Sequence, residues 1–369
     1  MKILVEIGHP AHVHFFKHAI EIWKERGHEL VVAARKKEMA LSLLRAHRIE
    51  SICLSRAGRG ISGLMAEMLA RDFRLWRLVR CFQPDVMTSI GGTWISHVSK
   101  ITGRPAVVFY DTENARTSNA ITYPFVSALC TPRCYLERTG LGQRHLCYPG
   151  YHELAYLRPD YFQPDPETAS FLQFSGREKC FLLRFISWKA GHDLSESGLT
   201  LGAKRYLVDM LKPFGRVFIS SEAPLPEDLQ AHSLPVPAHS VHDLMARSTL
   251  VIGESATMAS EAAVLGIPAV FISDTGRGYI KEQEERYGLV YHYTNRQTEQ
   301  AFRRIERLIE WPDLLDRWKE KRKAMLNDTI DVTSFVVDFI ENFPESLSTY
   351  RRKWASIQQE GGRGSRRDG

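Results

Sequence analysis

The stretch Gly253–Val270, GESATMASEAAVLGIPAV, follows the apolar run Thr249–Ile252 and leads into Phe271 and Ile272. This pattern indicates a strand, a tight turn, a helix that stops at Gly266, and a second strand. The first turn of such a helix directs unpaired N–H groups and a positive dipole end at the preceding turn. The stretch therefore predicts either an anion site at the helix mouth or an ordinary βαβ unit with a serine cap.

The side chains of this stretch favour a nucleotide diphosphate over a simpler anion. The turn residues Gly253, Ser255 and Ala256 are small, so a ligand can approach the backbone. Glu261 lies about two turns into the helix, where a carboxylate either accepts hydrogen bonds from sugar hydroxyls or is simply solvated. A nucleotide diphosphate has both features, because its phosphates are anionic and its ribose carries a diol. The residues that we expect to contact it are Gly253, Ser255, Ala256, Thr257, Met258 and Glu261.

The composition is that of a soluble globular protein with two domains. The chain has 369 residues, 44% of them hydrophobic and 25% charged, which is long for a single core. Its apolar N-terminus contains the acid Glu6 and no small-residue cleavage site, so we interpret it as a first strand. The six cysteines form no CxxC pair, which argues against a structural zinc ribbon and for a reducing cytoplasm.

Strands and helices alternate over the first 150 residues and again in the second half of the chain. This alternation predicts an α/β fold with parallel sheets in two Rossmann-like halves, whose ligands bind at the strand ends facing a central cleft. The Pro-rich stretch 148–165 is interpreted as the connection between the halves. Neither the dinucleotide fingerprint G-x-G-x-x-G after the first strand nor a P-loop is present. The strands that we expect are 2–7, 29–34, 51–54, 84–90, 105–110, 180–185, 216–220, 249–252 and 268–272.

Polar residues also follow the expected strands of the N-terminal half. His9 and His12, in the sequence Gly-His-Pro-Ala-His after the first strand, are candidates to orient or deprotonate a hydroxyl, since the pKa of histidine lies near neutrality. His14 and His18 have the i,i+4 spacing of metal ligands, but no third ligand or nearby carboxylate is identifiable, so we expect no metal. The acceptor-side residues that we expect are His14, Gly92, Glu113 and Asn114.

Two further loops follow expected strands of the C-terminal half. Lys189 lies in the first of these loops and is a candidate to neutralise a phosphate. Arg277 lies between Gly276 and Gly278 after the last expected strand, where it could face a diphosphate or a carboxylate. We therefore add Lys189 and Arg277 to the expected donor site.

Two motifs carry a family resemblance. Ile7–Phe16 and Gly253–Pro268 resemble a bacterial and archaeal family of unknown function that has the two-domain GT-B glycosyltransferase architecture, and the resemblance extends to about residue 343. The second half is similar to the N-acetylglucosaminyltransferase that makes lipid II. It is also similar to the non-hydrolysing UDP-N-acetylglucosamine 2-epimerase, whose D-S-G-G-x-Q-E-E signature has the register of Glu254–Glu261.

The resemblance implies that the helix beginning near Ser255 receives the nucleotide diphosphate and that Glu261 holds the ribose. Glu113 and Asn114 look like the E-Q-N of the lipid II enzyme. The expected domains are 1–155, rejoined by a helix at about 330–343, and 166–328. The basic residues 350–369 are expected to form a disordered tail.

We therefore expect a metal-independent, inverting glycosyltransferase without a cofactor, which uses a UDP-linked donor and a cell-surface polysaccharide or lipid-linked acceptor. One alternative is a 2-epimerase, although Ser187-Trp-Lys replaces the H-R pair of that enzyme. The other is a nucleotide-sugar-binding protein without catalytic activity. The expected location is the cytoplasm, with no nucleic-acid partner. The basic segment 56–80 either packs on the sheet or meets the inner face of the membrane.

Overall fold

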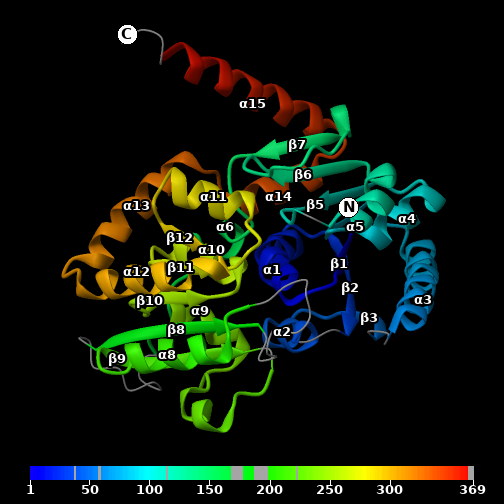
Figure 1. Cartoon of the computed structure of the whole chain (residues 1–369). Coiled ribbons are helices and arrows are strands. Elements are labelled where there is room, and N and C mark those ends of the chain that lie inside the picture. The colour runs from blue at the N-terminus through cyan, green and yellow to red at the C-terminus, as the bar shows by residue number, and fades with distance from the viewer. Residues whose placement is uncertain are drawn as a thin grey trace. The chain divides into compact units, whose positions relative to one another are not determined.

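The computed structural model describes residues 1–36, 39–56, 60–113, 115–167, 178–186, 198–221 and 223–364. The chain divides into two compact units. Unit 1 comprises Met1–Tyr156 and Ile330–Gly369, and unit 2 comprises Leu157–Thr329. Each unit contains its own parallel sheet (Figure 1), so the expected α/β class with two parallel sheets is confirmed.

The sheet of unit 1 has seven strands in the order β3-β2-β1-β4-β5-β6-β7, and each pairing is parallel. The inner strand β1 pairs on one side with β2, where Val5 faces Val32, and on the other with β4, where Val5 faces Thr88. The strand order reverses between β1 and β4, and ligands of such sheets bind at the C-terminal strand ends beside that point. The strands are β1 (Lys2–Ile7), β2 (Glu29–Lys36), β3 (Ile52–Arg56), β4 (Val86–Ile90), β5 (Ala106–Phe109), β6 (Ala128–Pro132) and β7 (His145–Tyr148).

The helices of unit 1 form two groups. In the first group α1 packs against α2 and α14, and in the second α4 packs against α3 and α5. Helix α1 buries Val13, Phe16, Ile20 and Trp23, the residues whose helical spacing predicts it. The helices are α1 (Pro10–Glu25), α2 (Ala40–Ala46), α3 (Gly60–Phe82), α4 (Thr93–Thr102), α5 (Arg116–Thr122), α6 (Leu154–Leu157), α14 (Val332–Glu341) and α15 (Glu345–Gly364).

Helix α15 occupies much of the stretch that the sequence predicted as a disordered tail. It extends from Glu345 to Gly364, so that prediction is wrong for residues 350–364. Tyr350 and Trp354 lie four residues apart, and both rings pack against Phe335 of α14, at 5.0 and 5.2 Å between centroids. The many charged residues around these two aromatics concealed an amphipathic helix.

The sheet of unit 2 has five parallel strands in the order β12-β11-β10-β8-β9. This is the flavodoxin-like order, in which the reversal falls between the first and third strands of the unit, here β8 and β10. Residues Cys180–Leu183 of β8 are completely buried, as expected of a strand covered on both faces. The strands are β8 (Lys179–Phe185), β9 (Gly215–Ser221), β10 (Leu250–Gly253), β11 (Ala269–Ile272) and β12 (Val290–Tyr293).

Helix α10 lies at the centre of the helices of unit 2. It packs against α9, α11 and α13 as well as against β10 and β11, and its residues from Met258 to Leu265 are buried. The helices are α8 (Leu201–Leu211), α9 (Val241–Ala246), α10 (Ala256–Leu265), α11 (Gly278–Glu285), α12 (Thr298–Glu310) and α13 (Leu314–Asp328). Among the described residues of the whole chain, no helix combines the length and the hydropathy needed to cross a membrane.

Candidate functional site

In unit 2 the candidate site lies where β10 leads into α10, beside the reversal of strand order. β10 ends at Gly253, and a Cβ atom there would lie 2.1 Å from the carbonyl oxygen of Arg184 on β8, so only glycine fits. Ser255 caps α10, because its Oγ accepts a hydrogen bond of 3.3 Å from the N–H three residues later. Ala256 and Thr257 in the first turn are partly exposed. Their backbone N–H groups have no acceptor within the helix and can bind an anion.

Glu254, the residue between the glycine and the cap, is a buried structural acid. Its carboxylate accepts hydrogen bonds from the N–H groups of Ile186 at 2.8 Å and Leu199 at 2.6 Å. The ammonium group of Lys204 lies 3.2 Å from the same carboxylate, and both side chains are buried. Burial lowers the pKa of Lys204, while Glu254 opposes that shift. Glu254 therefore fixes the end of β8 and the start of the segment that enters α8.

Glu261, the expected ribose ligand, is buried in α10 and already has a protein partner. Its Oε1 lies 3.0 Å from Nε2 of His242 on α9, and 5% of the residue is exposed. The ring of His242 in turn meets Phe162 edge-on at 6.3 Å. The carboxylate is therefore held in one orientation by a neighbouring helix.

Arg277 follows β11, which pairs with β10, so it belongs to the same edge of the sheet as Gly253. It caps α11 with extended backbone, and its Nη1 donates a hydrogen bond of 2.9 Å to the carbonyl oxygen of Gly276. The guanidinium group is thus folded back on its own loop. Lys189, expected in the donor site, and Asn114, expected on the acceptor side, lie outside the described residues.

In unit 1 the β1–α1 turn uses two histidines to satisfy backbone N–H groups. The N–H of Gly8 donates to Nδ1 of His12 at 3.2 Å, and the N–H of Ala11 donates to Nδ1 of His9 at 3.2 Å. A neutral imidazole that accepts at Nδ1 carries its proton on Nε2. The ring of His12 therefore carries an N–H donor on Nε2 at the start of α1.

His12 remains neutral at physiological pH. Burial lowers its pKa to about 3, with further lowering by His9, His152 and Arg71, against which Asp111 acts in the opposite direction. A ring of this kind is a poor proton acceptor at neutral pH. Its geometry suits donation of a hydrogen bond to a substrate oxygen.

Asp111 and His152 form a pair that also belongs to this edge of the sheet. Asp111 follows β5, and its Oδ2 lies 3.1 Å from Nδ1 of His152, which follows β7. Burial alone would raise the pKa of Asp111, but His152, the hydroxyl of Thr112 and His12 outweigh it, so this pKa is lowered. A charged carboxylate at this position holds the proton of His152 on Nδ1. No described residue hydrogen-bonds to the buried Nε2 of His152.

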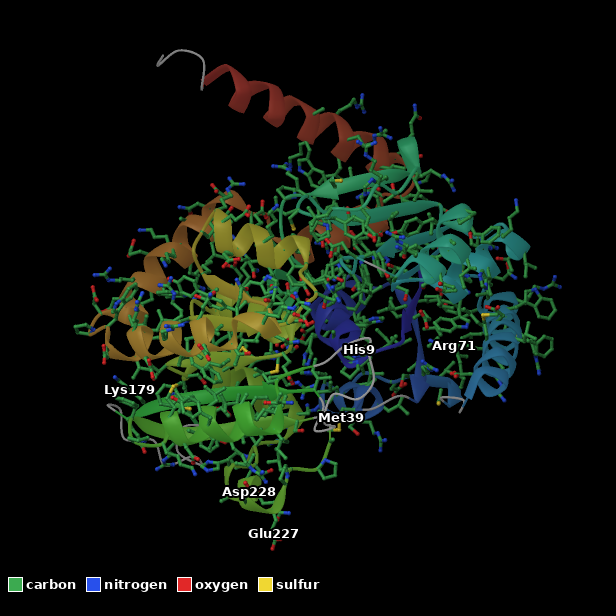
Figure 2. The ribbon with its side chains drawn as sticks, in the orientation of Figure 1. His9, Met39, Arg71, Lys179, Glu227 and Asp228 are labelled. Atoms are coloured by element: carbon green, nitrogen blue, oxygen red, sulfur yellow. The ribbon has the colours of Figure 1, made fainter. Side chains whose placement is uncertain are left out.

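Arg71 of α3 forms a buried ion pair beneath the β1–α1 turn. Its guanidinium group donates to Glu6 of β1, which also accepts a hydrogen bond of 2.6 Å from the hydroxyl of Ser89 on β4. The guanidinium carbon lies 3.7 Å from the centroid of the Trp94 ring. Arg71 is completely buried, and Figure 2 labels it on α3 together with His9 at the start of α1. This pair ties β1, β4 and α3 together at the reversal of strand order.

The remaining residues expected on the acceptor side occupy three different environments. Gly92 precedes α4 with φ of 64°, and a Cβ atom there would lie 2.3 Å from Cγ2 of Val108. Glu113 is buried and accepts a hydrogen bond of 3.3 Å from the N–H of Leu136. His14 stacks on Tyr156 at 5.3 Å between ring centroids. Two residues beyond His12, it points to another side of α1 because each residue turns a helix by about 100°.

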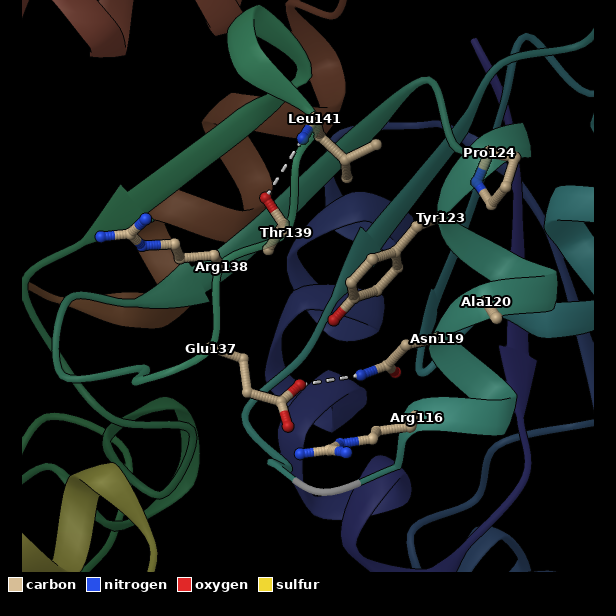
Figure 3. A pocket seen from close by; sticks show the side chains of 9 residues that line it. All are labelled: Arg116, Asn119, Ala120, Tyr123, Pro124, Glu137, Arg138, Thr139 and Leu141. Carbon is tan, nitrogen blue, oxygen red and sulfur yellow. Dashed lines mark hydrogen bonds between the residues drawn. The ribbon is translucent and has the colours of Figure 1, made fainter.

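A surface pocket of about 510 Å³ lies between α5 and the segment that follows β6. In Figure 3 the side chains of Asn119 and Glu137 meet at a hydrogen bond of 3.1 Å, with Arg116 beside them. Tyr123 and Leu141 add apolar surface to the lining. The pocket offers both charge and apolar contact at the C-terminal ends of β5 and β6.

Sequence reasoning missed Glu6, Arg71, Asp111 and His152 as members of one region. An acid such as Glu6 in the middle of an apolar strand is a usable signal, because a buried carboxylate needs a partner. His152 lies in the Pro-rich stretch that we interpreted only as a connection, and no local pattern marks its pairing with Asp111. Among the described residues, no group of three His, Cys, Asp or Glu side chains is arranged to hold a metal ion.

The chain belongs to the family described as "Protein of unknown function (DUF354)", which it matches over residues 1–342. This match confirms the family resemblance of the two motifs. The fold is that of GT-B proteins, which include glycosyltransferases and UDP-GlcNAc 2-epimerases.

Three solved structures illustrate the shared fold. The UDP-GlcNAc 2-epimerase from Neisseria meningitidis bound to UDP-GlcNAc has a TM-score of 0.64 at 13% identity, over 92% of this chain and 99% of that one. MurG from Acinetobacter baumannii has a TM-score of 0.57 at 15% identity, over 93% and 100%. The glycosyltransferase SsfS6 from Streptomyces sp. SF2575 has a TM-score of 0.59 at 12% identity, over 93% and 100%. At these identities the likeness concerns the fold alone.

Proposed function

We propose that the protein is a glycosyltransferase that moves a sugar from a nucleotide-diphosphate donor, most simply a UDP sugar, to the hydroxyl of a glycan or lipid-linked acceptor. The observation that carries this proposal is the β10–α10 turn, where a capped helix with partly exposed first-turn residues begins beside the reversal of strand order. Backbone N–H groups at that place suit a diphosphate. A neighbour of the same fold is bound to UDP-GlcNAc, which supports the choice of donor.

The donor would lie along the edge of the unit 2 sheet. In this proposal the backbone of residues 255–258 binds the diphosphate, Glu261 accepts hydrogen bonds from the ribose, and Lys189 and Arg277 offset the phosphate charge. The reaction needs no metal if the helix mouth and these cations stabilise the leaving diphosphate. Arg277 would have to exchange its contact with Gly276 for one with a phosphate.

The acceptor would lie along the edge of the unit 1 sheet. His12 offers the N–H of its Nε2 to the oxygen atoms of the acceptor, because its Nδ1 accepts a hydrogen bond from the N–H of Gly8. His9 belongs to the same turn and is the second residue that we propose there. The pocket lined by Arg116 and Glu137 suits the body of a sugar-containing acceptor. The configuration at C1 of the donor sugar is inverted if the acceptor hydroxyl displaces the diphosphate directly in one step.

The proposal is tested at Thr257, a partly exposed residue of the helix mouth, by calorimetric titration of the full chain with UDP. Thr257→Glu introduces a negative charge beside the diphosphate, whereas Thr257→Gln adds a side chain of the same size without charge. We expect the Glu variant to bind UDP at least about tenfold more weakly than the Gln variant, because a like charge at the helix mouth opposes the phosphates. The difference should shrink in high salt.

Equal UDP affinity of the two variants would show that the diphosphate does not bind at this turn. If the wild-type chain bound no nucleotide, both enzymatic hypotheses would fall, leaving a protein that works through other partners.

An epimerase is the second candidate, because a UDP-GlcNAc 2-epimerase has the highest TM-score of the three structures compared. It differs from a transferase in needing no acceptor. NMR of UDP-N-acetylglucosamine incubated with the protein alone separates the two, since only an epimerase produces a second sugar nucleotide. A protein that binds UDP and leaves all sugar nucleotides unchanged with every acceptor would be the non-catalytic alternative.

A further inference from the structure

His152 is a buried imidazole with one ring nitrogen whose role nothing described so far explains. Only 6% of the residue is exposed, and no described residue hydrogen-bonds to its Nε2. Buried polar atoms in proteins nearly always have a partner, and the exceptions often mark functional sites. The missing partner of Nε2 is therefore a clue to a ligand.

The partner of the other ring nitrogen decides what this ligand must offer. Asp111 lies 3.1 Å from Nδ1 of His152, and a carboxylate there requires the imidazole proton to lie on Nδ1. The lone pair of Nε2 is then available as an acceptor. His152 is thus arranged in the opposite sense to His12, whose Nδ1 accepts the Gly8 N–H and whose Nε2 carries the proton.

The surroundings of His152 hold the ring rigidly. Its ring stacks parallel to that of Tyr148, with 6.4 Å between centroids and 4° between planes, and meets Phe15 of α1 at 4.6 Å. Both aromatic side chains are buried. An imidazole fixed in this way keeps the direction of its free lone pair, which a proton acceptor for a bound substrate requires.

We propose that His152 is the general base that takes the proton of the acceptor hydroxyl, with Asp111 as the residue that positions it and His12 as a hydrogen-bond donor to the same oxygen. One hydroxyl has one hydrogen to give and lone pairs that accept, which matches one acceptor ring and one donor ring. The ligand class is therefore an alcohol. This inference rests on the proposed function and names the proton acceptor that the function needs.

In the reaction the acceptor O–H bond breaks and its proton passes to Nε2 of His152. The oxygen uses the freed electron pair to form the new bond to C1 of the donor sugar. The bond between C1 and the diphosphate oxygen breaks, and its electron pair leaves with the nucleotide diphosphate. The imidazolium that forms is stabilised by the carboxylate of Asp111 and later releases its proton to water.

Activity and binding are measured on the same full-length variants. The variants are His152→Gln, Asp111→Asn and, as a matched control elsewhere in unit 1, His28→Gln, whose ring contacts Glu341 at 2.9 Å. UDP release from UDP-N-acetylglucosamine is followed with an alkyl glucoside as the alcohol, and UDP affinity by calorimetry. We expect a loss of turnover of about 100-fold or more for His152→Gln and Asp111→Asn. UDP affinity should remain unchanged in all three variants, and the turnover of His28→Gln should remain that of wild type.

A second measurement does not depend on turnover. Long-range ¹H–¹⁵N NMR of histidine-labelled protein distinguishes the two neutral tautomers. We expect the proton of His152 on Nδ1 and that of His12 on Nε2. We also expect added imidazole to restore part of the UDP release in His152→Gly, which a purely structural role would not produce.

Two results would overturn this assignment while leaving the proposed function intact. One is a His152 ring protonated on Nε2. The other is normal UDP binding together with turnover of His152→Gln within threefold of wild type. Absence of UDP binding in all proteins, the wild type included, would instead overturn the proposed function itself.

Discussion

Glu254 and Glu261 are two acids of the same strand–helix unit with different partners. Glu254 is saturated by two backbone N–H groups and the ammonium group of Lys204, so it is part of the scaffold. Oε1 of Glu261 lies 3.0 Å from Nε2 of His242 on the neighbouring helix α9. Of the two acids, Glu261 is the one that we propose for the ribose.

The role of Glu261 at the ribose predicts a loss of discrimination between nucleotides. The wild-type protein should bind UDP more tightly than 2′-deoxy-UDP, since a hydrogen bond to a charged group contributes about 1.5–3 kcal/mol. Glu261→Gln keeps the shape of the side chain and removes its charge. We therefore expect the difference in binding free energy between UDP and 2′-deoxy-UDP to fall to less than about half of the wild-type difference. Calorimetric titration of both proteins with both nucleotides gives the four values needed. An undiminished preference in the variant would place the ribose elsewhere.

At the scale of elements, the β10–α10 turn depends on close contact between β8 and β10. The carbonyl oxygen of Arg184 lies 2.1 Å from the position of a Cβ atom at Gly253, a distance that no side chain tolerates. The same close pairing brings the end of β8 beside the start of α10. Gly253 therefore determines both the packing of β8 against β10 and the geometry of the β10–α10 turn.

Gly253→Ala should consequently destabilise unit 2. Separation of β8 and β10 should cost about 3 kcal/mol, the upper range for overpacking, or roughly 6–12 °C in Tm for a unit of this size. Gly276→Ala is the matched control, because its Cβ atom would meet its nearest neighbour, Cε1 of His292, at an ordinary 3.6 Å. Thermal unfolding followed by circular dichroism compares the two. A change of Tm no larger in Gly253→Ala than in the control would contradict the packing argument.

At the scale of the whole molecule, hydrophobic periodicity and strand-end placement account for what the sequence could predict. Long apolar strands such as β1 and β8, and amphipathic helices such as α1, have local signals. β6, with the sequence Ala128–Pro132, and β12 lack them, because these short strands are stabilised by parallel pairing with neighbours.

The candidate site also combines features with local sequence signals and features that depend on tertiary structure. The β10–α10 turn is contiguous in sequence, so its shape was predictable. The pair Asp111 and His152 is separated by 41 residues (152 minus 111), and its formation depends on how β5 and β7 are placed in the sheet. Glu6 and Arg71 are related in the same way. Only tertiary structure brings such residues together.

The two units should respond differently to acid, because His12 and His18 of α1 both belong to unit 1. Burial lowers the pKa of His18 to about 4, with Lys17 and His47 acting in the same direction, and that of His12 to about 3. In the unfolded chain both histidines bind protons near pH 6.5. Below that pH the unfolded state therefore holds more protons, and the free energy of unfolding of unit 1 falls until the folded pKa values are reached.

His18→Gln isolates one of these protons at a position remote from the β1–α1 turn. Between pH 6 and pH 5 the folded ring is neutral and the unfolded ring is charged, so His18 should steepen the loss of stability by about 1 kcal/mol per pH unit. We expect the free energy of unfolding of unit 1 to fall less steeply with decreasing pH in the variant, by this amount. Hydrogen exchange of β1 amides reports on unit 1, and exchange of β10 amides, whose pH dependence the substitution should leave unchanged, reports on unit 2. Equal slopes for β1 in wild type and variant would show that His18 is protonated in the folded chain, which contradicts its lowered pKa.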